Sequence, residues 1–107
     1  MGIPSAELSD GVLTAHVLRS DTFGNLILNA SNEQLIELGA QLGDALTIRH
    51  EGARHTATYV ATFADVTPGE LLIYEDSQQM VSLAVNRGSA AQLLGADQDD
   101  ELLILPE

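Results

Sequence analysis

Two short polar turns carry residue types that could hold a flat, uncharged ring. The first, at residues 21–25, reads Asp-Thr-Phe-Gly-Asn and places the aromatic ring of Phe23 and the carboxamide of Asn25 around a glycine. An asparagine amide offers both a donor and an acceptor, the pattern needed to read the edge of a purine. The second turn, Asn86-Arg87-Gly88, closes an apolar run. These turns favour an aromatic heterocycle held between a ring and an amide.

The only other phenylalanine, Phe63, also stands at a turn, just before Pro68-Gly69. Buried structural rings more often lie in the middle of a strand, so two turn-located rings favour a ligand site. The alternative is that Phe23 and Phe63 plug the two ends of a barrel.

The three histidines, His16, His50 and His55, give little support to a metal site. His50 and His55 flank a predicted hairpin turn, where they could face each other across two strands and bind zinc. No third ligand is evident, and two exposed histidines at strand ends are the favoured interpretation.

The acidic cluster before the last strand is interpreted as a solvated turn. It resembles half a calcium loop but lacks the glycine of the EF-hand pattern. The cluster consists of Asp97, Asp99, Asp100 and Glu101.

No catalytic residue is predicted from spacing. The chain has no cysteine, no Gly-x-Ser-x-Gly and no Gly-x-Gly-x-x-Gly, so nucleophile elbows, thiolate chemistry and dinucleotide-binding turns are excluded. We expect no bound metal and no tightly bound cofactor.

Composition narrows the possible partners. The 107 residues carry sixteen acidic and four basic side chains, a net charge of −12, and all four basic residues are arginine. Nucleic-acid phosphates and anionic membranes both need cations, so neither is an expected partner. With 45% hydrophobic residues the chain is long and apolar enough for one core. We expect a cytoplasmic protein.

Short apolar runs separated by turns would position these residues. Gln34 follows Ser31 by three residues in a capping-box pattern, and Gly39 is a natural stop, which predicts one short helix. A helical turn is predicted within residues 88–94. Strands are predicted at residues 12–18, 26–28, 45–50, 54–60, 71–74, 80–85 and 101–105. The fold class is therefore all-β: a small closed or nearly closed barrel of six or seven strands with one or two short helices.

Four segments resemble one family, the C-terminal domain of the S-adenosylmethionine hydroxide adenosyltransferases, which includes the fluorinase and chlorinase. They run in order along nearly the whole chain. The segments are residues 21–29, residues 59–70, Ser77, and residues 83–91.

The resemblance implies a ligand, S-adenosylmethionine or adenosine, bound against the barrel. Phe23 and Phe63 would pack near the adenine, and Asn25 would hydrogen-bond its edge. Backbone around Asn86 and Arg87 would reach the same ring, and Ser77 would lie near the methionine carboxylate.

The resemblance also implies partners for the barrel. Family members place an α/β domain before it and assemble as trimers, with the ligand between that domain of one subunit and the barrel of its neighbour. Water or hydroxide, or halide in specialised members, attacks the ribose C5′ there and expels methionine. Residues 1–10 are accordingly interpreted as a lead-in at the domain junction and residues 11–107 as the barrel domain.

The chain departs from the family at two places. Residues 78–80, Gln-Gln-Met, replace a segment that usually holds a glycine and an aromatic residue, and Thr22 stands where a basic residue is frequent. Two alternatives therefore remain. Beside the C-terminal domain of a two-domain enzyme, the chain could be a free-standing barrel that binds an adenosyl ligand or docks onto a separately encoded catalytic half. It could also be a non-enzymatic interaction or structural module that has kept the fold and some turn residues.

Overall fold

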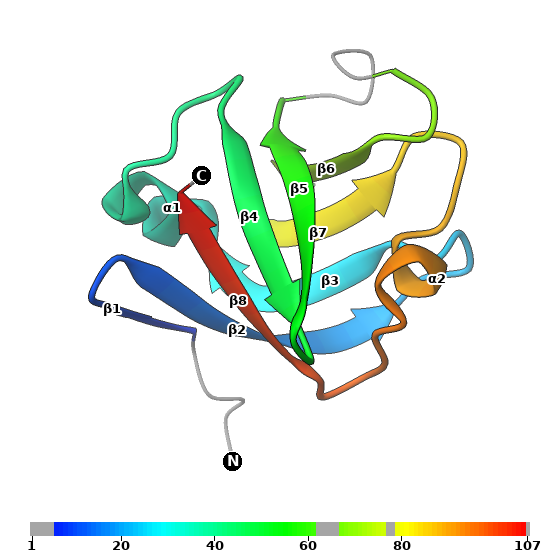
Figure 1. The fold of residues 1–107 in the computed structure, drawn as a ribbon, viewed down its shortest axis with the longest axis horizontal. Coiled ribbons are helices and arrows are strands. Elements are labelled where there is room, and N and C mark those ends of the chain that lie inside the picture. The colour runs from blue at the N-terminus through cyan, green and yellow to red at the C-terminus, as the bar shows by residue number, and fades with distance from the viewer. Residues whose placement is uncertain (1–5, 62–66, 77–78, 107) are drawn as a thin grey trace.

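The computed structural model describes residues 6–61, 67–76 and 79–106. It contains eight strands and two short helices within these ranges (Figure 1). In chain order they are β1 (Glu7–Ser9), β2 (Val12–Ser20), β3 (Leu26–Ser31), α1 (Asn32–Leu38), β4 (Ala45–His50), β5 (Ala53–Tyr59), β6 (Leu71–Glu75), β7 (Met80–Val85), α2 (Ala90–Leu94) and β8 (Glu101–Pro106).

Seven of the strands close into a barrel. The sheet order is β1-β2-β3-β7-β6-β5-β4-β8, and an additional pairing of β2 with β8 completes the ring. Leu13 faces Ile104 across that closing seam. Strand β1 pairs only with β2 and lies outside the ring. The predicted all-β barrel with two short helices is confirmed.

One pairing departs from the antiparallel pattern. Strands β5 and β6 are parallel, with Thr58 beside Leu72, and every other pairing in the described part of the sheet is antiparallel. A parallel pair needs a crossover connection rather than a tight turn. The sequence predicts neither this pair nor the three-residue strand β1.

Alternating side chains fill the barrel. In β2 the buried positions alternate with half-buried ones, which is the period-2 pattern of a strand with one face on a core. The fully buried large side chains of the main core come from six of the strands and from α1: Leu13, Val17, Leu26, Leu28, Leu35, Leu46, Ile48, Ile73, Leu83, Leu102 and Ile104. Leu72 is also fully buried but belongs to a separate cluster with Val60 and Ala84.

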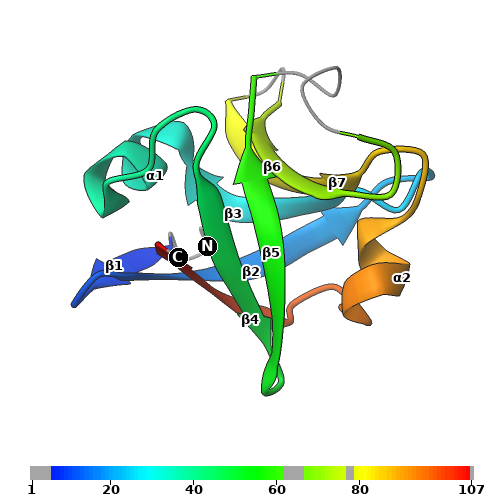
Figure 2. The ribbon, with the colours of Figure 1, turned by 45° about the horizontal axis from the view of Figure 1, so that its top comes forward.

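Both helices begin at a serine cap and lie on opposite sides of the barrel (Figure 2). At α1 the Ser31 Oγ accepts from the Gln34 N–H at 3.3 Å, and the Gln34 Oε1 accepts from the Ser31 N–H at 3.0 Å. This is the predicted capping box, and Gly39 ends the helix with φ +101°. At α2 the cap is Ser89, whose Oγ accepts from Gln92 N–H.

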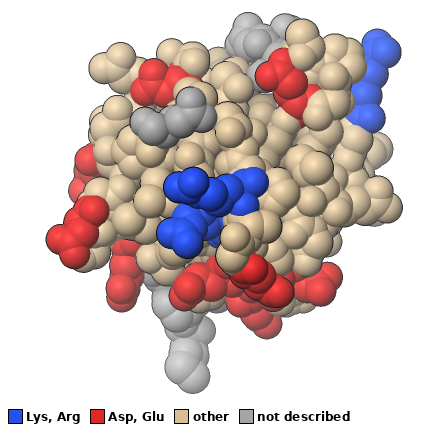
Figure 3. Space-filling model, in the orientation of Figure 1, with Lys and Arg blue, Asp and Glu red and all other residues tan. Residues whose placement is uncertain are grey.

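Charge is distributed unevenly over the surface. Figure 3 shows basic side chains in the middle of one face, over β4, β5 and β8, with acidic side chains along the edge below them. Arg49 and Arg54 are exposed and face each other across the β4–β5 pair. No helix in the described ranges is long and apolar enough to cross a membrane.

Candidate functional site

A cleft of about 450 Å³ lies where the β2–β3 turn approaches the connection between β7 and α2. These two segments are far apart in the sequence but lie side by side in the fold (Figure 1). The cleft is lined by Phe23, Asn25, Val85, Arg87 and Gly88. Its volume falls within the range of small-molecule sites, which is about 300–1,000 Å³.

Asp21 organises the first of these segments. Its Oδ1 accepts from the N–H groups of Phe23 and Asn25 at 2.9 and 3.0 Å, and its Oδ2 accepts from the Asn25 Nδ2 at 2.9 Å. Burial of the carboxyl raises its pKa, but the hydrogen bonds from Asn25 and Phe23 outweigh this and lower the pKa of Asp21 below its usual value. Asp21 is therefore charged at neutral pH and holds the turn closed.

Gly24 attaches this turn to the start of α2. Its φ is +83°, and a Cβ at this position would lie 2.0 Å from the Ser89 Oγ. Its carbonyl oxygen accepts from the Ala91 N–H at 2.9 Å. Only glycine combines this conformation with such a close approach. The spacing between the two walls of the cleft is thus set by direct contact.

The Phe23 ring and the Asn25 amide are the groups presented at the cleft. Phe23 is 76% exposed, so its ring contributes nothing to the barrel core. The Asn25 Nδ2 donates one of its two hydrogens to Asp21. The same amide also has a second hydrogen on Nδ2 and a carbonyl oxygen. The turn therefore presents a flat apolar surface beside a donor–acceptor pair. The alternative that Phe23 plugs the barrel is wrong.

The opposite wall is a tight turn after β7. Arg87 has φ +61°, an uncommon conformation for a residue with a side chain, and the Gly88 N–H donates to the Val85 oxygen at 3.0 Å. Two backbone hydrogen bonds fix the position of Asn86. Its carbonyl oxygen accepts from the Gly69 N–H at 2.7 Å, and its N–H donates to the Glu70 carbonyl oxygen at 3.1 Å.

The structure brings together three of the six residues that the sequence singled out. Phe23, Asn25 and Arg87 line the cleft, and Asn86 is next to it in the chain. Phe63 and Ser77 lie outside the described residues. The sequence did not single out Val85 or Gly88 as lining residues. Gly88 belongs to the predicted turn, whereas nothing marks Val85 apart from any strand-end valine.

Gln79 and Met80 belong to the segment in which the chain departs from the family pattern. Gln79 has φ +66°, the left-handed conformation that glycine adopts at no steric cost. The Asp76 side chain contacts the start of β7: its Oδ1 accepts from the Met80 N–H and its Oδ2 accepts from the Ser82 hydroxyl, both at 3.1 Å. Gln79 therefore adopts a conformation that is more usual for glycine.

The predicted facing of His50 and His55 is wrong. In the β4–β5 hairpin His50 lies opposite Ala53, and His55 lies opposite Ile48. His50 is also not an exposed strand-end residue, since only 5% of it is accessible to solvent. Its Nε2 lies 2.9 Å from the Asp100 Oδ2. A two-histidine zinc site across this hairpin is therefore ruled out.

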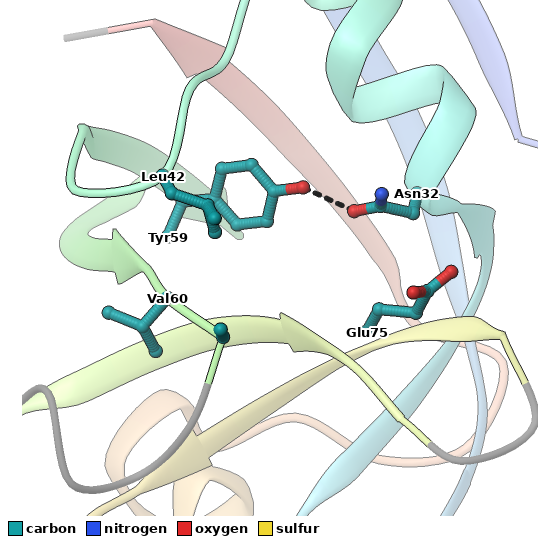
Figure 4. Close-up of a pocket in the computed structure, with 6 residues that line it drawn as sticks. Asn32, Leu42, Tyr59, Val60 and Glu75 are labelled. Atoms are coloured by element: carbon teal, nitrogen blue, oxygen red, sulfur yellow. Dashed lines mark hydrogen bonds between the residues drawn. The ribbon is translucent and has the colours of Figure 1, made fainter.

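Another, smaller hollow of about 200 Å³ lies beside the start of α1. Figure 4 shows the Tyr59 hydroxyl pointing at Asn32, to whose Oδ1 it donates a hydrogen bond. Leu42 and Glu75 line the same hollow. Burial raises the pKa of the Tyr59 hydroxyl, so the group is a neutral donor at physiological pH. The hollow is lined by none of the predicted site residues that the structure describes.

Comparison with known proteins agrees with the resemblance. Residues 15–103 match the family model described as the SAM hydroxide adenosyltransferase C-terminal domain. The chain belongs to this family. Two curated relatives carry the name (R)-S-adenosyl-L-methionine hydrolase: one from Salinispora tropica is 46% identical over 96 residues, and one from Salinispora arenicola is 40% identical over 96 residues. Each match covers 90% of this chain and 33% of the relative, so the chain spans about a third of their length.

Two solved structures share the fold of this family member. An uncharacterized conserved protein from Thermotoga maritima superposes with a TM-score of 0.94 at 28% identity, over 98% of this chain and 40% of that one. A conserved hypothetical protein from Thermus thermophilus gives a TM-score of 0.66 at 29% identity, over 86% of this chain and 34% of that one. In both, the matching region is a minor part of a longer chain.

Proposed function

We propose that this chain is the adenine-binding barrel of an S-adenosylmethionine hydroxide adenosyltransferase, whose reaction converts S-adenosylmethionine and water or hydroxide to adenosine and L-methionine. The observation that carries the proposal is the cleft that joins Phe23, Asn25 and Arg87 from two distant turns. Family membership and the names of the two Salinispora relatives support the choice of ligand.

The cleft suits adenine in shape and chemistry. The exposed Phe23 ring offers a face for stacking, and the Asn25 carboxamide can pair with an adenine edge, which presents an amino donor beside a ring-nitrogen acceptor. Because Asp21 anchors the Asn25 side chain, the amide is oriented before the ligand arrives, which lowers the entropy lost on binding. Phe63, Asn86 and the backbone of Arg87 are proposed to complete the adenine contacts, and Ser77 to approach the methionine end.

The chemical step needs more than this cleft. Attack on the ribose C5′ requires water or hydroxide and the sulfonium to be aligned and shielded from solvent, and a barrel can supply only one wall of such a site. We propose that an α/β domain of the same family, from a neighbouring subunit of a trimer, supplies the other wall and the catalytic groups. The isolated chain is therefore expected to bind ligand weakly and to show no turnover.

The test is a calorimetric titration of the chain with adenosine and with both sulfonium epimers of S-adenosylmethionine. We expect weak, saturable binding of adenosine that Asn25→Ala and Phe23→Ala each reduce at least about fivefold, as expected for the loss of a hydrogen bond or a stacking contact. The matched control is Leu93→Ala, which truncates an exposed apolar side chain that lies on α2 and does not line the cleft. Binding that survives both substitutions would remove the cleft from the proposal, and adenosine production by the pure chain would contradict the need for a second wall.

A further inference from the structure

A buried imidazole at the end of β4 faces two carboxylates from different parts of the chain. His50 is 5% exposed, and its Nδ1 lies 3.0 Å from the Leu94 carbonyl oxygen at the end of α2. A carbonyl oxygen only accepts hydrogen bonds, so Nδ1 carries a hydrogen and donates it. Nε2 is thereby fixed as the atom that faces the carboxylates.

These carboxylates are close and differ in exposure. The Asp100 Oδ2 lies 2.9 Å from the His50 Nε2, and the Glu51 Oε2 lies 3.5 Å from it. A neutral imidazole would direct the Nε2 lone pair at negative charge, so a cation, either a proton or a metal ion, belongs between them.

The spacing also suits a metal ion. The three ligand atoms all lie within 4.8 Å of one another. Zinc bonds of about 2.0–2.1 Å in a tetrahedral arrangement place ligand atoms roughly 3.3 Å apart, between the two distances that His50 makes. A ligating histidine typically donates its other N–H to a backbone carbonyl or carboxylate, and Leu94 provides that acceptor here. Glu51 is 77% exposed, which leaves a path for the ion and room for a water.

The surroundings of this cluster attract cations. Exposed Asp97, Asp99 and Glu101 neighbour Asp100 in the chain, within a molecule of net charge −12. Such a field concentrates divalent cations near the surface. We propose that His50, Glu51 and Asp100 form a binding site for a divalent transition-metal ion, with Zn²⁺ as the probe. The ion clamps the β4–β5 turn to the segment that precedes β8.

The test is calorimetry of the chelator-treated chain with ZnCl₂ at neutral pH, together with thermal unfolding. We expect one saturable site, a melting temperature that rises until one equivalent is bound, and a change in the His50 ring resonances. Glu51→Gln, an exposed position that leaves the fold intact, is expected to weaken Zn²⁺ binding at least about tenfold. Glu37→Gln serves as the control, because Glu37 is an exposed residue of α1 and its substitution removes the same charge away from the proposed site.

Three outcomes would overturn the metal site. One is the absence of saturable heat up to millimolar Zn²⁺, which would leave a proton between His50 and Asp100. Another is equal weakening by Glu51→Gln and Glu37→Gln, which would mean that only net charge attracts the ion. The third is Ca²⁺ binding as tightly as Zn²⁺, because the imidazole is the ligand that should discriminate between them.

Discussion

The β2–β3 turn and the cluster of His50, Glu51 and Asp100 (the His50 cluster) are both held by side-chain hydrogen bonds, yet these bonds span very different distances along the sequence. Asp21 binds groups two and four residues away. His50 is tied to Leu94 and Asp100, which are 44 and 50 residues away. The turn is thus a local device that presents a ring and an amide, whereas the cluster joins distant parts of the barrel. Substitutions should separate the two roles.

The largest loss of stability is expected from a substitution of Gly24, because this residue of the β2–β3 turn packs directly against the distant Ser89. Gly24→Ala places a Cβ 2.0 Å from the Ser89 Oγ at φ +83°, and strain plus overpacking should cost about 3 kcal/mol of unfolding free energy. Gly43→Ala is the control, because φ there is +96° with nothing within 4 Å, and it should cost about 1 kcal/mol. Equal losses in urea unfolding would mean that the contact with Ser89 is unimportant.

A slightly smaller loss is expected from His50→Ala, measured with a chelator present so that no metal contributes. Removal of a buried ring and of its two long-range bonds should cost about 2–3 kcal/mol. His55→Ala, on the same hairpin but only half-buried, should cost less than about 1 kcal/mol. If His55→Ala proved the more destabilising of the two, the cluster would not be a tie between distant segments.

Asp21→Asn should have a moderate effect that depends on pH. The pKa of Asp21 is lower in the folded chain than in the unfolded one, so its carboxylate stabilises the fold fully above the ordinary aspartate pKa. This stabilisation is lost as the pH falls through the lowered pKa of the folded chain. The wild type should lose stability relative to Asp21→Asn in that acidic range, as followed by unfolding at a series of pH values. Parallel curves for the two proteins would show that the turn does not depend on the charge.

The smallest effect on stability is expected from Phe23→Ala. Because the ring is 76% exposed, the unfolding free energy should change by less than about 0.5 kcal/mol, even though the same substitution should weaken adenosine binding. A large loss of stability would instead place the ring among the groups that support the barrel.

The same difference in reach explains what could be predicted from the sequence. The capping box of α1 and the Asp21–Asn25 turn can be predicted from the sequence because the residues that hydrogen-bond to each other lie within four positions. Apolar alternation likewise indicated the barrel strands. The His50 cluster could not be predicted, because nothing in the sequence near His50 indicates that Asp100 is its partner. The nearer His55 suggested the wrong partner. The parallel β5–β6 pair was missed for the same reason, because a strand pattern carries no information on its direction.

The seam between β2 and β8 also bears on how the protein is made. One side of that seam is the second strand and the other is the last, and β8 is hydrogen-bonded to β4 on its other edge. While a ribosome is still adding residues 101–106, the strands already synthesised have two unpaired edges and no closed core. Folding of this domain is therefore completed only after release of the last strand from the exit tunnel, and until then its open edges are the surfaces that a chaperone would need to protect.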